Sequence, residues 1–411
     1  MKSDLDSIMQ ANGIDALLVT GPAQHNPAMV YLTGGGHLTN ADLIHKRGEA
    51  PVLFHAAMER DEAAKTGLAT RSYNLYPFRQ LMDEAGGDRV KAAALRYCKM
   101  FSDVGVTTGR VAVFGRTELS AALPVLRALE QMLPGIELVG DPEGLILSAA
   151  TLTKDAAEVE RIRKMGQITV EVVGRTADFL TSRPLEGDVL LDDGKPLTIG
   201  RVKGLINLWL AELGAENPEG TIFAIGRDAG VPHSSGNPAD IIRLGRTIVY
   251  DIFPCEAGGG YFYDFTRTWC LGYAPDDVQQ VYQDVLTVFN TVNAEFKAGT
   301  PFVDYQKRTA ELFESMGHPT VLSTPETEEG YVHSLGHGVG LRIHERPFSG
   351  AGASPEDVLI PGVVATVEPG LYYPERGLGV RLENTFYVRP DGTFETLVDY
   401  PLDLVLPMRR Q

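Results

Sequence analysis

Four carboxylates and one histidine in the C-terminal half of the chain have the side-chain types of a metal site: Asp251, Asp264, His337, Glu368 and Glu383. Oxygen-rich ligand sets with one imidazole suit divalent Mn, Co, Fe or Zn, whereas structural zinc sites use more thiolates. With only one nitrogen donor in the set, carboxylates must bridge two ions. The residue types therefore predict a dinuclear site for divalent metals.

Two of these acids end strongly apolar segments. Asp251 follows the run at 247–250, and Glu368 closes the run at 363–367 before a Pro-Gly turn. Burying an unpaired carboxylate costs on the order of several kcal/mol, so such strands do not normally contain an acid without a partner. For a lone aspartate, a turn position or an ion pair with a neighbour such as Arg267 would be the better interpretation. The repeated order of strand, acid and turn favours the metal site instead.

Sequence alternation places further groups beside these acids. Asp264, Thr266 and Thr268 share one face of a segment with a period of two. Arg381 and Glu383 likewise share one face of a later segment. We therefore expect Arg381 next to the metal site, where it either keeps Glu383 ionised and oriented or contacts the substrate.

The histidines give the most specific signal. Four of the nine histidines are candidates for the site: His233, His333, His337 and His344. A lone histidine is usually structural, but the last three are clustered in HSLGHGVGLRIH. Three glycines in that motif would allow the close backbone approach that a ligand in a crowded site requires, and they are Gly336, Gly338 and Gly340.

Five motifs together resemble the creatinase/aminopeptidase P/prolidase family of pita-bread metallopeptidases, whose fold is shared with methionine aminopeptidase. They are PHSSGNP at 232–238, YDFTRT at 263–268, GHGVGLRIHERP at 336–347, VEPGLY at 367–372 and GVRLEN at 379–384. The N-terminal region, with GIDALLVTGP at 13–22 and YLTGG at 31–35, resembles the creatinase-type domain of this family. That likeness disfavours methionine aminopeptidase, which generally lacks such a domain.

The resemblance implies roles for the five candidate ligands. Asp251 would hold one divalent ion, His337 and Glu368 the other, and Asp264 and Glu383 would bridge both. Mn is the ion that we expect, with Co, Zn or Fe as alternatives. Two such ions activate a water molecule and polarise a carbonyl.

The resemblance also implies catalytic and substrate-binding residues. Glu368 would accept the proton of the attacking water, and His333 and His344 would stabilise the oxyanion or bind the scissile amide. His233 matches a substrate-side histidine of the family. Tyr372 and Arg381 match positions that contact substrate or support the metal site.

Three features depart from the family pattern. The hairpin that would bring Asp251 and Asp264 together is longer than usual. Phe348 follows HERP where many prolidases have an arginine that helps to recognise short substrates. Cys255 lies inside the longer hairpin, and we interpret it as structural.

The function that these residues imply is hydrolysis of the bond between an N-terminal residue and proline, in dipeptides or in longer peptides. The partner would be a peptide with proline at its second position. One alternative is another hydrolase or lyase of the same fold that acts on a small molecule such as creatine or an ectoine derivative. The other is a non-catalytic binding module, which the complete ligand set disfavours.

Elements that position these residues follow from sequence patterns. Residues 1–150 alternate strand-like runs (16–20, 52–55, 111–114, 136–139) with helical stretches such as 119–132, which predicts an α/β domain. Residues 151–411 begin with a long helix over 154–180, capped by Thr153, and a helix over 199–213 that ends at Gly214. Strands at 247–253, 261–270, 363–368 and 379–388 then predict a curved antiparallel sheet. The resemblance implies that the first domain is creatinase-like and that the second is the pita-bread domain. The overall fold class is therefore α/β (α+β).

Composition bounds the class of protein. With 44% hydrophobic and 22% charged residues the chain is globular, and its net charge of −17 argues against a nucleic-acid partner. Three scattered cysteines do not form a disulfide framework. The N-terminus lacks the pattern of a signal peptide, and no apolar run is long enough to cross a membrane. We expect a cytoplasmic protein with no membrane partner, and a homodimer.

Overall fold

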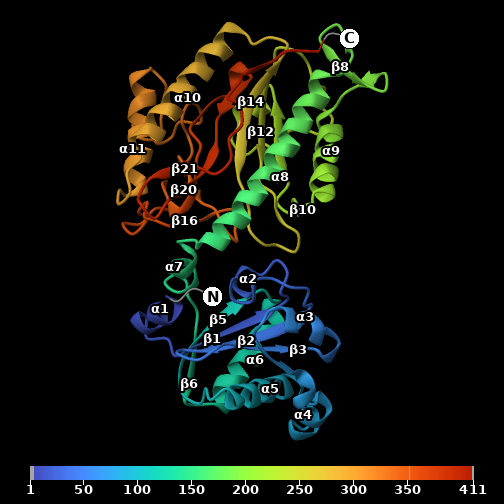
Figure 1. Ribbon diagram of the computed structural model, residues 1–411, viewed down its shortest axis with the longest axis vertical. Coiled ribbons are helices and arrows are strands. Elements are labelled where there is room, and N and C mark those ends of the chain that lie inside the picture. Colours follow the sequence, from blue (N-terminus) through green and yellow to red (C-terminus); the bar gives the residue numbers. More distant parts are fainter. Residues whose placement is uncertain (1–3, 351, 410–411) are drawn as a thin grey trace. The chain divides into compact units, whose positions relative to one another are not determined.

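The computed structural model describes residues 4–350 and 352–409. The chain divides into two compact units. Residues 4–151 with Gly258–Gly260 form the N-terminal unit, and residues 152–257 with 261–409 form the C-terminal unit. Both units combine helices with strands (Figure 1), which confirms the predicted α/β (α+β) class.

A six-stranded mixed sheet forms the centre of the N-terminal unit. Its strands are β1 (Ala16–Gly21), β2 (Ala41–Lys46), β3 (Val52–His55), β4 (Ala69–Ser72), β5 (Gly109–Gly115) and β6 (Ile136–Val139). They lie in the order β4-β3-β2-β1-β5-β6, and β1 pairs parallel with β5 and antiparallel with β2. The helices are α1 (Leu5–Ala11), α2 (Pro27–Thr33), α3 (Arg60–Lys65), α4 (Phe78–Glu84), α5 (Arg89–Asp103), α6 (Leu119–Met132) and α7 (Leu147–Thr151), with short 3₁₀ turns η1 (Ala57–Glu59) and η2 (Tyr73–Leu75).

Several sheets form the C-terminal unit. Its strands are β7 (Leu185–Glu186), β8 (Val189–Asp192), β9 (Lys195–Pro196), β10 (Ala215–Glu216), β11 (Thr221–Ile225), β12 (Thr247–Ile252), β13 (Cys255–Glu256), β14 (Phe265–Leu271), β15 (His337–Gly338), β16 (Glu345–Phe348), β17 (Val364–Val367), β18 (Gly370–Tyr373), β19 (Leu378–Arg381), β20 (Asn384–Val388), β21 (Phe394–Thr396) and β22 (Val405–Leu406). These strands pair antiparallel except for β14 with β22, which are parallel. Three sheets carry the candidate site, in the orders β11-β12-β14-β22, β16-β15-β17-β20-β21 and β18-β19. A backbone bridge between Thr266 and Glu383 joins the first sheet to the segment between β19 and β20.

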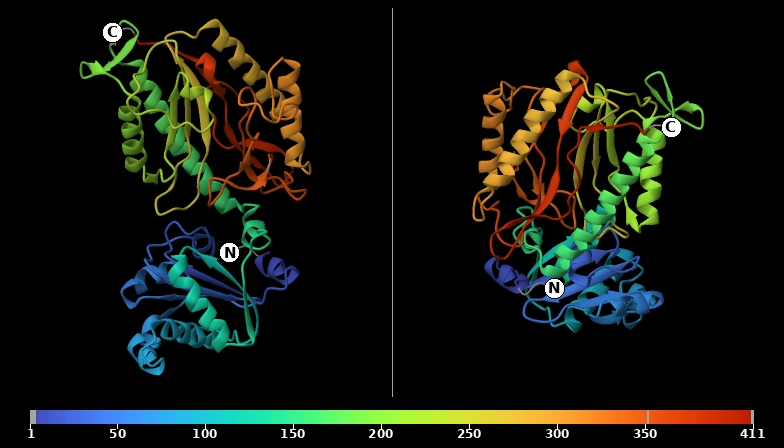
Figure 2. Two further views of the ribbon diagram at one scale, coloured as in Figure 1. Left: turned by 180° about the vertical axis from the view of Figure 1, so that it is seen from behind. Right: turned by 45° about the horizontal axis from the view of Figure 1, so that its top comes forward.

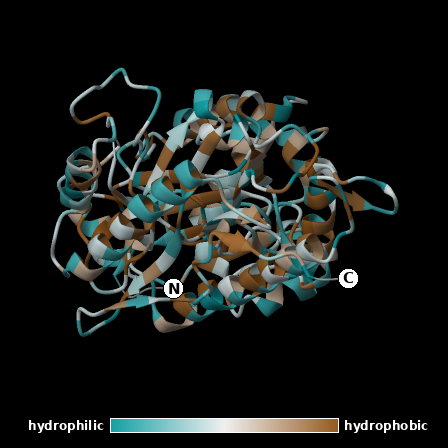
Figure 3. Ribbon diagram, turned by 90° about the horizontal axis from the view of Figure 1, so that it is seen from above, coloured by the Kyte–Doolittle hydropathy of each residue, from teal (hydrophilic) through white to brown (hydrophobic). Residues whose placement is uncertain are grey.

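Four helices pack against these sheets: α8 (Ala156–Thr181), α9 (Ile199–Glu212), α10 (Asp276–Glu295) and α11 (Phe302–Ser315). Two short turns, η3 (Asp228–Gly230) and η4 (Pro374–Arg376), connect strands. α8 packs on β14 and α9 on β11, whereas α10 packs on β18 and β19 and α11 on β16 (Figure 2). The helices alternate apolar and polar stretches, as expected for one buried face (Figure 3). Every helix in the described part of the chain is too short or too polar to cross a membrane.

The N-terminus of α8 differs from the prediction. Asp155, not Thr153, caps the helix, and its side chain and that of Glu158 form a reciprocal capping box. On the buried face of α8, Thr169 follows Met165, whereas Ile168 is only half-buried. A helix has 3.6 residues per turn, so a step of four from Met165 stays on the buried face here and a step of three leaves it.

Two predicted strands are shorter than expected. The segment 261–270 becomes regular only at Phe265, because β12 and β14 pair from Ile252 and Phe265 onwards and the chain between them forms a long connection. The segment 379–388 is divided at Leu382 and Glu383, since β19 pairs with β18 and β20 with β17. The second break places Glu383 between two sheets.

Candidate metal centre

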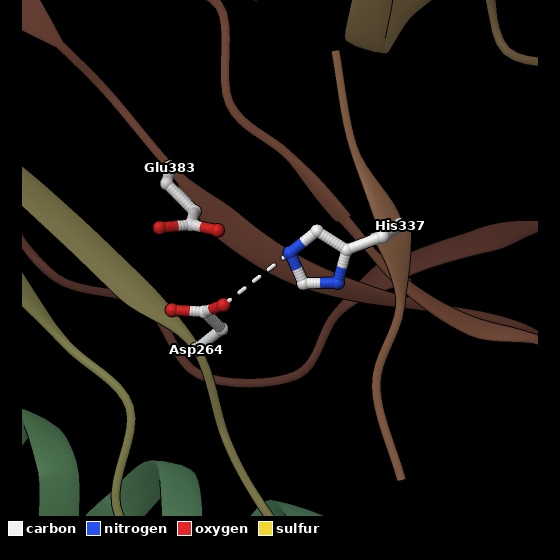
Figure 4. Close-up of side chains that lie close together, drawn as sticks. All are labelled: Asp264, His337 and Glu383. Carbon is white, nitrogen blue, oxygen red and sulfur yellow. Dashed lines mark ion pairs between the residues drawn. The ribbon is translucent and has the colours of Figure 1, made fainter. Parts of the chain in front are cut away.

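Three side chains from separate strands converge in the C-terminal unit. Asp264 directly precedes β14, His337 begins β15, and Glu383 lies between β19 and β20. Each offers one ligand atom, and these atoms all lie within 4.8 Å of one another (Figure 4). All three residues are buried. The structure thus brings together three of the five predicted ligands as a compact group.

Glu368 joins this group through the histidine. The Nε2 atom of His337 lies 3.3 Å from Glu368 Oε1 and 3.5 Å from Asp264 Oδ2. The Nδ1 atom of His337 is 3.0 Å from the Gly338 carbonyl oxygen, to which it donates when protonated. That hydrogen bond orients the ring and leaves Nε2 as the atom that can bind a metal.

Asp251 is held by Arg381. The Arg381 Nη2 group donates to Asp251 Oδ2 at 2.5 Å, and both side chains are almost inaccessible to solvent. The negative charge of Asp251 is the largest cause, after burial, of the raised pKa of Asp264, so the two acids lie in the same neighbourhood. The structure therefore places Arg381 beside the site as predicted, but paired with Asp251 rather than with Glu383.

Two buried carboxylate oxygens lack a donor. Asp251 Oδ1 and Glu383 Oε1 accept no hydrogen bond from any residue in the described ranges. The other oxygen of Glu383 accepts a hydrogen bond from Thr266 Oγ1 at 2.7 Å. Buried oxygens of this kind are costly unless a cation binds them. Together with the donor set of four carboxylates and one imidazole, they fit hard or borderline divalent ions.

The electrostatics of the cluster also favour cations. Burial and neighbouring carboxylates raise the pKa values of Asp264 and Glu383 well above the ordinary range. Burial acts to lower the pKa of His337, but the hydrogen bond and charge of Glu368 and the charge of Asp264 raise it to about 9. For Glu368, burial is outweighed by the hydrogen bond and charge of His337, and its pKa falls to about 2. The positive charges of Arg381 and a protonated His337 do not balance four ionised acids, so the cluster favours bound cations.

Glycines let the histidine segment approach its neighbours, as predicted. A Cβ atom on Gly336 would lie 2.2 Å from the Thr366 carbonyl oxygen, and one on Gly338 would lie 2.1 Å from that of Arg346. Any side chain at either position would therefore push β15 away from β17 or β16. Such a shift would move His337 away from Glu368.

A hydrogen-bonded chain runs from the predicted substrate-binding residues to His333. Arg381 Nη1 donates to the Tyr372 hydroxyl at 2.7 Å, and that hydroxyl lies 2.9 Å from His333 Nε2. His333 Nδ1 lies 2.7 Å from the Ser334 carbonyl oxygen. Burial lowers the pKa of His333 to about 4, so its ring is neutral at pH 7. With Nδ1 protonated, Nδ1 donates a hydrogen bond to the Ser334 carbonyl and Nε2 accepts one from the Tyr372 hydroxyl, so both ring nitrogens have a partner.

The other two candidate histidines, His233 and His344, are exposed. The His344 ring is 4.3 Å from the His337 ring in an edge-on arrangement and is exposed. Removal of water by the surrounding protein, followed by the charge of His337, lowers the pKa of His344 to about 4. His233 is also exposed, and it contributes to lowering the pKa values of both His333 and His344, so it lies in their neighbourhood.

Sequence reasoning missed several supporting residues. Thr266 donates to Glu383 and accepts from Arg381 Nε at 3.2 Å, a role that its shared face with Asp264 could have indicated. Lys154 forms a buried ion pair with Glu345, the residue after His344. These partners are 191 positions apart, and their local sequences do not predict the pair.

A buried cluster of carboxylates around one histidine, between antiparallel strands and beside further histidines, defines the class of metal-dependent hydrolases. The sequence model of metallopeptidase family M24 matches residues 160–390, which is more than half of the chain. The chain belongs to metallopeptidase family M24, and the resemblance found in the sequence is confirmed.

Individual relatives agree with this assignment. The chain is 30% identical over 281 residues to the probable dipeptidase PepE of Mycobacterium bovis, which covers 66% of this chain and 67% of that protein. It is 29% identical over 248 residues to the Xaa-Pro dipeptidase of Pyrococcus furiosus, covering 60% and 63%. The structure resembles that of the X-Pro aminopeptidase from Thermotoga maritima, with a TM-score of 0.73, 22% identity and coverage of 97% and 99%. The last comparison shows the fold, which is the predicted pita-bread fold with its additional N-terminal unit.

Proposed function

We propose that this metallopeptidase is a dinuclear-metal exopeptidase that hydrolyses the bond between an N-terminal residue and proline. The observation that carries the proposal is the buried convergence of Asp264, His337 and Glu383 beside two carboxylate oxygens that lack donors. The names of similar proteins, Xaa-Pro dipeptidase and X-Pro aminopeptidase, support the substrate class. Both dipeptides and longer peptides with proline at the second position are candidate substrates.

The proposed ligands are the five residues predicted from the sequence. Asp251 would hold one ion, His337 and Glu368 the other, and Asp264 and Glu383 would bridge both. The donor set suits Mn, which we propose as the ion, and also Co, Zn or Fe. When bound, such ions polarise the scissile carbonyl and lower the pKa of a water molecule. Asp251 would hold its ion through Oδ1, which lacks a donor, while Oδ2 keeps its contact with Arg381.

Glu368 is the proposed proton acceptor. Its carboxylate is ionised at neutral pH, chiefly because His337 outweighs the effect of burial on its pKa. His337 must be neutral to act as a metal ligand. With ions bound in place of the His337 proton, the Glu368 carboxylate would stay ionised and able to accept a proton. Glu368 lies at the edge of the cluster, 14% exposed, where it can meet water.

The histidines have distinct proposed roles. His344 is exposed and offers a ring N–H to the oxyanion that forms on the scissile carbonyl. His233 would contact the substrate from the opposite loop. His333, with both nitrogens occupied, would shape the site together with Tyr372, while Arg381 fixes Asp251 and donates to the Pro232 carbonyl oxygen at 3.2 Å. That last contact ties the loop of His233 to the metal centre.

Hydrolysis of matched peptides tests the substrate class. Proline lacks an amide N–H and fixes φ, so a site shaped around it gains nothing comparable from alanine. We expect the Mn-loaded protein to cleave Ala-Pro or Ala-Pro-Ala and to leave Ala-Ala and creatine unchanged. The two proline peptides together distinguish a dipeptidase from an aminopeptidase. Equal rates on Ala-Pro and Ala-Ala, or turnover of creatine alone, would overturn the proposal.

Metal identity and assembly are part of the same proposal. We expect Mn in protein isolated without added metal, which elemental analysis measures, and a homodimer, which sedimentation measures. A monomer, or a different ion in the native protein, would correct these two points and leave the peptidase proposal standing, because the ligand set accepts several divalent ions.

A further inference from the structure

A glutamine outside the cluster supports the segment that carries two of its histidines. Gln306 lies in α11, directly after Tyr305, on the border of the buried face formed by Phe302, Tyr305 and Phe313. It is half-buried. A carboxamide at that border is expected either to reach solvent or to satisfy buried backbone groups.

The carboxamide of Gln306 satisfies buried backbone groups. Its Oε1 accepts from the backbone N–H of Leu335 at 2.5 Å and from the Tyr331 hydroxyl at 3.1 Å. Its Nε2 donates to the His333 carbonyl oxygen at 3.2 Å. These partners fix the orientation of the amide, because the reversed group would direct N–H groups at the N–H of Leu335 and an oxygen at the carbonyl of His333.

The contacts of Gln306 connect to the cluster on two sides. The carbonyl oxygen of Leu335 accepts a hydrogen bond from the Glu368 N–H at 2.8 Å, so one residue links Gln306 to the proposed proton acceptor. The Tyr331 ring, held through its hydroxyl, packs edge-on against the His333 ring with centroids 5.7 Å apart. Gln306 therefore touches both the backbone of His333 and the residue that supports its ring.

Further along the segment, Ser349 continues the support. Its hydroxyl accepts from the Gly336 N–H at 2.9 Å and donates to the Gly336 carbonyl oxygen at 2.8 Å. His337 then donates its backbone N–H to Thr366 Oγ1 at 3.1 Å. The whole segment from His333 to His337 is thus held by side chains from other elements, and Gln306 is the one that reaches it from a helix.

We propose that Gln306 is a positioning residue, which fixes the backbone at 333–335 and thereby the placement of His333 and His337 relative to Glu368. This inference rests on the proposed function. Small displacements of reacting groups reduce rates strongly, and groups that orient metal ligands contribute in the same way. This role is not readable from the sequence, because Gln306 is 27 positions from His333.

The test compares three variants with the natural protein. Gln306→Glu keeps the size and the Oε1 acceptor but places an oxygen against the His333 carbonyl, and Gln306→Leu removes both polar contacts. Gln283→Glu makes the same chemical change on the exposed surface of α10 and serves as the control. The readouts are metal content, thermal unfolding, kcat and KM on Ala-Pro, and the visible spectrum of the Co²⁺-loaded protein.

We expect Gln306→Glu to retain both ions and a near-normal unfolding temperature while kcat per loaded site falls about 10- to 100-fold. KM should change little, the Co²⁺ bands should shift, and Gln283→Glu should match the natural protein. An unchanged kcat per loaded site, or a loss equal to the unfolded fraction, would overturn the proposal. If Gln306→Leu does not fold, the results for Gln306→Glu alone test the positioning role.

The two proposals fail in different ways. If the natural protein does not cleave Ala-Pro, the proposed function is wrong, and the Co²⁺ spectrum then decides the role of Gln306. A spectrum that differs between the natural protein and Gln306→Glu, but not in Gln283→Glu, supports the positioning role. Identical spectra in all three proteins would contradict it.

Discussion

Lys154→Met should destabilise the C-terminal unit severely. The Lys154 side chain is 2% exposed and that of Glu345 is 8% exposed, with Nζ and Oε1 2.5 Å apart. Glu345 also lies against Gly340, where an added Cβ would come within 2.2 Å of its Oε1. The carboxylate therefore has little room to turn toward water. Removing one partner of a buried ion pair costs about 3–5 kcal/mol, because the remaining charge stays buried.

Urea unfolding followed by tryptophan fluorescence measures this loss, since both tryptophans, Trp209 and Trp269, lie in the C-terminal unit. Lys307→Met breaks an exposed pair with Glu311 and is the control, expected to change stability by less than about 1 kcal/mol.

The double variant Lys154→Met/Glu345→Met should be more stable than Lys154→Met alone, because it removes both buried charges and keeps similar volume. A single-variant loss no larger than that of the control would refute the account of a desolvated pair. Additive losses in the double variant would show that each residue acts through packing rather than through the other charge.

Three further predictions concern the cluster itself. Glu368→Gln keeps size and one coordinating oxygen, so it should retain at least one ion and lose about 10²- to 10⁴-fold in turnover; near-normal turnover with two ions bound would assign the proton elsewhere. His344→Ala should reduce kcat far more than metal content, and loss of both ions would make His344 a ligand instead. Metal binding at pH 7 should release protons, because His337 has a pKa of about 9 and the pKa values of Asp264 and Glu383 are raised in the metal-free protein. Below pH 9 protons compete with the metal, so affinity should rise with pH until His337 is neutral; calorimetry in buffers of different ionisation enthalpy measures the release, and none at pH 7 would contradict these pKa shifts.

Three of the side chains that the sequence singled out converge in the structure, whereas some elements around them differ from the prediction. Alternation in their segments brought out Asp264 and Glu383, and the glycine-rich histidine motif brought out His337, so both signals were local. The division of the last predicted strand at Glu383 was not readable, since a period of two continues across the break. Only the pairing partners, β18 for one half and β17 for the other, reveal it.

The sequence also did not show which residues the predicted side chains would contact. Alternation placed Arg381 on the face of the acids but did not show which acid it would reach, and the structure pairs it with Asp251. Lys154 and Gln306 are isolated polar residues in helical or capping sequence, and their partners are far away along the chain. Such contacts depend on tertiary packing, which local periodicity does not encode.

A titration of metal-free protein with Mn²⁺ tests the central claim most directly, because it follows bound ions and Ala-Pro hydrolysis in the same samples. We predict no hydrolysis without metal and an activity that rises as ions bind, to a maximum at two ions per chain. Full hydrolysis in metal-free protein, or metal binding to saturation without any cleavage of Ala-Pro, would contradict the account.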